Sequence, residues 1–121
     1  MLKNLVILLK FADHKNRKVP TKGQISVLFN RIGGHKTLAP SGSIRDIYRS
    51  NSYNRLNVVS TIMPWITLPK TEAYYADNNY GETRHIFEEA LNNALNRLDN
   101  NPRFNFKNFD RNNDGVIDAI T

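Results

Sequence analysis

Residues 5–11, LVILLKF, form an apolar run that only Lys10 interrupts. Strands that are covered on both faces carry runs of this kind, so we predict a buried first strand here. The run does not fit a secretory signal, because it is short and no small-residue cleavage site follows before Asp13 and His14.

Two helices are predicted after this strand. Thr21 is placed to cap a helix over residues 22–31, which the pair Gly33-Gly34 ends. Ser43 is placed to cap a second helix that fades near residues 51–52. A strand followed by an amphipathic helix favours an α/β or α+β layer.

Strand and helix patterns continue along the rest of the chain. Residues 56–68 are rich in β-branched and aromatic side chains and contain Pro64, which predicts two short strands or one bent strand. Residues 69–81 form a polar connection whose tyrosines either line a binding rim or, more commonly, pack half-buried. Residues 82–99 carry the clearest helical stripe, which consists of Ile86, Phe87, Ala90, Leu91, Ala94, Leu95 and Leu98. The predicted class is α/β (α+β), with a mixed β-sheet and packed helices.

Composition limits the classes of function. The chain has 121 residues, enough for a single domain or a partial domain over residues 1–121, and it has no cysteine and no stretch long enough to cross a bilayer. A formal charge of +6 favours anionic partners. The basic residues are scattered, however, and no aromatic platform accompanies the cluster at 14–18, so specific nucleic-acid binding is not predicted.

An Asp-rich loop lies at the end of the sequence. Oxygen side chains occupy its first, third, fifth and ninth positions around a glycine at the sixth, which is the spacing of a calcium-binding loop. Calcium takes about 6–8 oxygen ligands, so the loop must curl until its donors converge. The predicted ligands are Asp110, Asn112, Asp114, the carbonyl of Val116, and Asp118.

Two alternatives to a complete EF-hand remain open for this loop. The twelfth position holds Thr121 rather than a bidentate glutamate, so one ligand is missing or comes from elsewhere in the fold. The loop is otherwise a polar turn without an ion, since Asn, Asp and Gly dominate turns. Residues 104–109 alternate after Pro102 and predict no entering helix, and residues 116–120 predict a strand without a partner.

No catalytic residues are predicted. The three histidines, His14, His35 and His85, lack zinc-ligand spacing, and each is expected to be solvated or to cap a helix. Glu88 and Glu89 point about 100° apart on one helix and cannot share a proton, and no serine has a nucleophile-elbow context.

Five strings, taken together, carry a resemblance to a known family. They are LVILLKFAD at 5–13, GSIRDIY at 42–48, NSYNRL at 51–56, TEAYYAD at 71–77 and the closing residues 109–120. Their content and order resemble the N-terminal half of the catalytic domain of immune inhibitor A-type zinc metallopeptidases. Asn54 stands where this family usually has glycine, and asparagine is among the few residues that enter the left-handed region cheaply.

The resemblance implies a zincin-like N-terminal subdomain with calcium ligation in the terminal loop. In the intact parent domain of this family, a His-Glu-x-x-His helix binds zinc and its glutamate activates water to cleave a protein or peptide. That motif is absent from residues 1–121, so zinc is expected only in the parent domain and this chain is expected to be inactive alone.

Two expectations concern the setting and the function. Calcium loops of moderate affinity fill more easily outside the cytosol, so an extracellular or secreted location is expected. The alternative function is a standalone calcium-stabilised module that binds a protein or glycan through residues 65–80.

Overall fold

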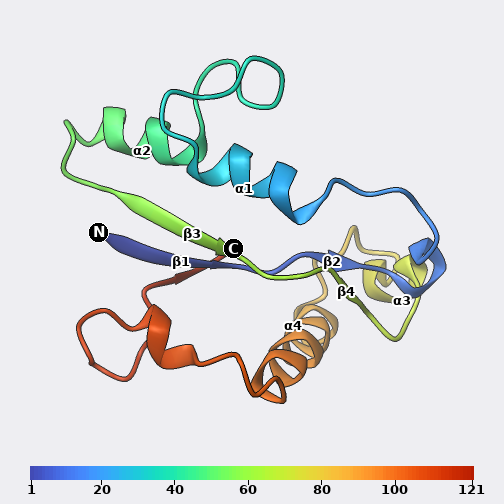
Figure 1. The fold of residues 1–121 in the computed structure, drawn as a ribbon. Coiled ribbons are helices and arrows are strands. Elements are labelled where there is room, and N and C mark those ends of the chain that lie inside the picture. The colour runs from blue at the N-terminus through green and yellow to red at the C-terminus, as the bar shows by residue number, and fades with distance from the viewer. The chain divides into compact units, whose positions relative to one another are not determined.

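The computed structural model describes residues 1–121, which form two compact units (Figure 1). The first unit comprises Met1–Ile7, Val19–Pro64 and Phe106–Thr121. The second unit comprises Leu8–Lys18 and Trp65–Asn105. No helix of either unit combines the length and the apolar character needed to cross a membrane.

The first unit is built on a three-stranded sheet. Its strand order is β3 (Val58–Ile62), β1 (Leu2–Val6), β5 (Ala119–Ile120), and both pairings are parallel. Leu5 is fully buried in the central strand, as the apolar run predicted. Parallel neighbours need a long connection that usually contains a helix, and the chain between β1 and β3 supplies two α-helices.

These two helices are α1 (Lys22–Asn30) and α2 (Ile44–Asn51), and both pack against β3. Figure 1 shows them on one side of the sheet, while the 3₁₀ helix η2 (Phe106–Phe109) lies on the other side. The predicted caps are confirmed, because Thr21 and Ser43 each form a capping box with the residue three positions later. Local hydrogen bonding therefore sets where each helix begins.

The loop between α1 and α2 is held by one carboxylate. Asp46 accepts hydrogen bonds from the backbone N–H groups of Gly33 at 3.1 Å, Gly34 at 2.9 Å and Ser43 at 3.0 Å. Gly34 has φ +70, and a Cβ there would lie 2.6 Å from the carbonyl oxygen of Ala39, so only glycine fits this close approach.

The second unit has a small sheet and three helices. Strand β2 (Leu9–Lys10) pairs in parallel with β4 (Ile66–Thr67). The helices are η1 (Ala12–His14), α3 (Glu72–Ala76) and α4 (Arg84–Asp99). A core of Leu68, Tyr75, Ile86 and Ala90, with Leu9 and Phe11 packed against it, holds them together.

Several predicted elements differ from the structure. The strand predicted over residues 5–11 is two strands, because Val6 ends β1 and Leu9 begins β2. The carbonyl of Val6 accepts the N–H of Met63 and that of Leu8 accepts the N–H of Ile66, whereas Pro64 has no N–H to donate in between. The predicted mixed sheet was wrong, since all strand pairings are parallel.

Two further predictions are corrected. The strand predicted at residues 116–120 is restricted to Ala119–Ile120, and it is paired with β1 rather than unpaired. The connection predicted at 69–81 contains α3, whose first turn is capped by the side chain of Thr71 accepting the N–H of Tyr74. Both errors arise because very short elements carry no periodic signal.

Candidate metal centre

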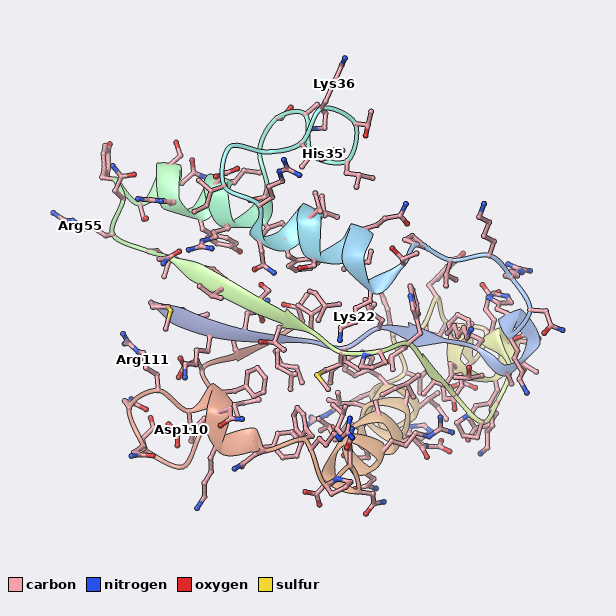
Figure 2. All side chains as sticks on the ribbon, in the orientation of Figure 1. Lys22, His35, Lys36, Arg55, Asp110 and Arg111 are labelled. Atoms are coloured by element: carbon pink, nitrogen blue, oxygen red, sulfur yellow. The ribbon has the colours of Figure 1, made fainter.

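The Asp-rich loop joins η2 to β5 in the first unit, and Figure 2 labels Asp110 and Arg111 on it. The N–H of Asp118 donates to the carbonyl oxygen of Phe109 at 2.7 Å, which closes the base of the loop. Residues 110–117 thus form a short excursion between two fixed ends.

Asp110, at the first position, curls the loop. Its Oδ1 accepts the N–H of Asp114 at 3.2 Å and its Oδ2 accepts the N–H of Gly115 at 2.8 Å. Gly115 has φ +83, a conformation that suits glycine at the sixth position. The first, fifth and sixth positions are therefore held together, as a curled cation-binding loop requires.

Asp118, at the ninth position, anchors the loop to the sheet. Its Oδ2 accepts the backbone N–H of Lys3 at 3.1 Å and its Oδ1 accepts that of Arg111 at 3.2 Å. The N–H groups of Lys3 and Arg111 lower the pKa of the Asp118 carboxyl group. The side chain of Asp118 thus continues the hydrogen bonding of β1 beyond the short strand β5, and it stays ionised at neutral pH.

The remaining side-chain donors lie at the middle of the loop. Asp114 accepts the N–H of Val116 at 2.9 Å through Oδ1 and the side-chain amide of Asn112 at 3.1 Å through Oδ2. An ionised carboxylate has about four lone-pair sites, so each of these oxygens keeps capacity for a cation. The donor set is composed of oxygen atoms, which suits calcium in its chemistry.

A pocket of about 350 Å³ borders this loop. Its lining residues come from the start of β1 and from the loop itself: Met1, Leu2, Arg111, Asn112, Asp114, Val116, Ile117 and Asp118. The pocket therefore exposes two of the loop carboxylates to solvent and to ions.

The three loop carboxylates do not form a group whose ligand atoms all lie within 4.8 Å of one another. Such a group exists in the second unit, where it consists of Asp13, His14 and Glu72. The sequence predicted a solvated or capping role for His14, but its side chain is only 16% exposed and its Nε2 lies 2.9 Å from Glu72 Oε2. Residue spacing gave no signal for this cluster, since Asp13 and Glu72 are 59 positions apart.

The other histidines have local roles or none that is visible. His35 Nδ1 accepts the N–H groups of Thr37 at 3.2 Å and Leu38 at 3.1 Å, so it stabilises a turn and not the end of a helix. His85 is exposed on the first turn of α4, as predicted.

Comparison with known families identifies the family of this chain. The family model described as Immune inhibitor A peptidase M6, catalytic domain, matches residues 2–118. The chain belongs to this family. No curated protein matches it. The family match confirms the resemblance found in the five sequence strings. Peptidases of this family are zinc metalloproteases that act on proteins.

The catalytic zinc of the family finds no matching ligand set in residues 1–121. The three histidines lie on three separate segments, and the one group of His, Asp and Glu ligand atoms within 4.8 Å of one another contains a single histidine. A His-Glu-x-x-His helix instead presents two imidazoles one turn apart on the same face. The residues described therefore do not fit that zinc site.

Proposed function

We propose that this chain forms a calcium-stabilised, non-hydrolytic part of a secreted metallopeptidase catalytic domain. The observation that carries the proposal is the family match over residues 2–118, combined with the absence of the zinc-binding motif from the same residues. Proteolysis then requires zinc ligands that residues 1–121 do not supply. The partner of the complete domain is a protein or peptide substrate.

Calcium binding is the second part of the proposal. Its support is the ligand spacing of Asp110, Asn112, Asp114, Val116 and Asp118, together with the hydrogen bonds that curl the loop around Gly115. The loop connects η2 to β5 and is tied to β1 through Asp118. Calcium bound there would stabilise the sheet of the first unit against unfolding.

Thermal unfolding with calcium and with a chelator tests this part. A ligand present at about 100 times its dissociation constant adds about 2.7 kcal/mol to the free energy of unfolding, so calcium should raise the Tm by several degrees. Asp114→Asn keeps a side-chain oxygen that can accept the N–H of Val116, so the loop should keep its shape. Because the substitution removes one charged ligand, the calcium-induced rise in Tm should largely disappear. Asp99→Asn, at the end of α4, makes the same charge change elsewhere and should retain the full shift.

A direct assay tests the non-hydrolytic part. The purified chain, supplied with zinc and calcium, should not cleave an unfolded protein substrate such as casein. Cleavage that a zinc chelator abolishes would overturn the proposal. An unchanged Tm with and without calcium would overturn the calcium site but leave the family assignment intact.

The alternative binding module has weaker support. It uses the surface of residues 65–80, but Tyr75 is 7% exposed and belongs to the core of the second unit. Tyr74 is held by its hydroxyl group, which donates to Glu89 at 2.7 Å, and by Lys70 over its ring. Tyr74 is therefore only 37% exposed, whereas Tyr80 is 98% exposed and is open to a partner.

A further inference from the structure

The cluster of Asp13, His14 and Glu72 is the strongest feature that the proposed function does not use. It lies in the second unit, where η1 and the first turn of α3 are neighbours (Figure 1). One imidazole and two carboxylates meet there with their ligand atoms all within 4.8 Å of one another.

The backbone brings these side chains together. The N–H of Leu68 donates to the carbonyl of Lys10 at 2.8 Å, and the N–H of Ala12 donates to the carbonyl of Lys70 at 3.0 Å. The two chain segments therefore continue the β2–β4 pairing up to the cluster. Asp13 and Glu72 then follow directly on the two sides of this ladder.

The orientation of Asp13 leaves one oxygen for a ligand. Its Oδ1 accepts the backbone N–H of Glu72 at 3.0 Å, and its Oδ2 lies 3.9 Å from Nε2 of His14. The hydrogen bond from the N–H of Glu72 is the main reason why the pKa of Asp13 is lowered, so this carboxylate is ionised at neutral pH. The bond to Glu72 also fixes where the free oxygen points.

His14 is positioned in a similar way. Its ring meets the ring of Phe11 edge to face, with a centroid distance of 5.4 Å and an interplanar angle of 81°. Its Nε2 lies 2.9 Å from Glu72 Oε2. A metal ion at about 2.0–2.2 Å from each of three tetrahedral ligands needs those ligands about 3.4 Å apart, so shifts of less than about 1 Å for these donor atoms would suffice.

We propose that Asp13, His14 and Glu72 bind a divalent transition-metal ion of the zinc class, with water completing the coordination. An imidazole with two carboxylates suits zinc, nickel or copper, whereas calcium prefers oxygen donors alone. Lys10 does not occupy the site, because its Nζ donates to the carbonyl of Lys15 at 3.3 Å. This site is separate from the catalytic zinc of the family, which needs two histidines of one helix.

The competing arrangement is an ion pair between a protonated His14 and Glu72. Both arrangements use the same atoms, but a metal ion needs a neutral imidazole as its ligand. Metal binding to a protonated imidazole would therefore release a proton, whereas the ion pair keeps it. Titration with a metal ion distinguishes them, since an ion pair alone binds no zinc.

The experiment is isothermal titration of the full chain with zinc, and with cobalt as a spectroscopic probe. Calcium is kept in excess so that the Asp110–Asp118 loop does not compete, and the solution is neutral to weakly alkaline. We expect one zinc per chain, and a visible cobalt spectrum that zinc abolishes. His14→Ala and Glu72→Gln should each weaken zinc binding by more than about tenfold.

Matched variants complete the test. His85→Ala removes an exposed histidine of the same unit, and Glu82→Gln makes the charge change of Glu72→Gln at an exposed position outside the cluster, so both should bind zinc like the parent chain. Circular dichroism of each variant shows whether it is folded, and the two cluster variants change different elements, η1 and α3. Zinc binding that is absent from the parent chain, or equal in the parent chain and His14→Ala, would overturn the proposal.

Discussion

Replacing Asn30 by alanine should destabilise the first unit through the outer edge of its sheet. The side-chain amide of Asn30 donates to the carbonyl of Ser60 at 2.8 Å and accepts the N–H of Ser60 at 2.8 Å. Alternate residues of β3 bond to β1, and Ser60 is one of those that face the other way. Asn30 therefore takes the place of a neighbouring strand at this point of the edge.

The size of the effect follows from these two bonds. Each net hydrogen bond contributes about 0.5–1.5 kcal/mol, and Ser60 is only 6% exposed, so water replaces the lost amide poorly. Asn30→Ala should then lower the free energy of unfolding by about 1–3 kcal/mol. Alanine is the better helix former at this last position of α1, so helix propensity works against the loss and cannot cause it.

Urea unfolding followed by circular dichroism measures this difference. Ser26→Ala is the matched control, because it removes only the 3.3 Å contact between the Ser26 hydroxyl and the Asn30 amide and leaves both bonds to Ser60. It should cost less than about 0.5 kcal/mol, because alanine is the better helix former and offsets most of the loss of this one contact. Equal stability of Asn30→Ala and the parent chain would refute the reasoning about the sheet edge.

Two other predictions concern the same unit. Leu5→Ala should cost about 2–5 kcal/mol in urea unfolding, because Leu5 is 0% exposed at the centre of the sheet, and a loss below about 1 kcal/mol would contradict its central place. The N–H groups of Ser43, Gly33 and Gly34 lower the pKa of Asp46 in the folded chain below its value of about 3.8 in the unfolded chain. The ionised carboxylate therefore stabilises the fold at any pH above 3.8, and this stabilisation is lost as the pH falls through the folded pKa. Asp46→Asn should therefore have a lower Tm than the parent chain at neutral pH, and the gap should narrow in acid; an equal gap at both pH values would disprove the role of the charge.

Locally encoded features of the fold were predictable from sequence. The capping residues Thr21 and Ser43 determine helix starts through bonds that span three residues, and the long helix α4 shows a regular stripe. Even there the sequence overstated the stripe, since Phe87 is 60% exposed. Which face of a helix is buried depends on what packs against it, and the sequence of the helix alone does not identify that partner.

Features that depend on pairing between distant segments were not predictable. The break between β1 and β2 depends on where Pro64 falls opposite them, and the extent of β5 depends on Asp118 bonding to Lys3 through its side chain instead of its backbone. The short helix α3 has five residues, too few for periodicity to appear. In each case the deciding bond joins residues that the linear pattern does not relate.

The same distinction separates the two candidate cation sites and the cations they suit. All predicted ligands of the terminal loop fall within nine consecutive residues, so their spacing alone suggested a site, and all are oxygen atoms that favour a hard cation such as calcium. Glu72 reaches Asp13 and His14 only because the β2–β4 ladder aligns two distant segments, and the imidazole of His14 shifts the preference toward zinc. A millimolar excess of calcium should therefore leave zinc binding at the cluster unchanged, because the two ions select different donor atoms.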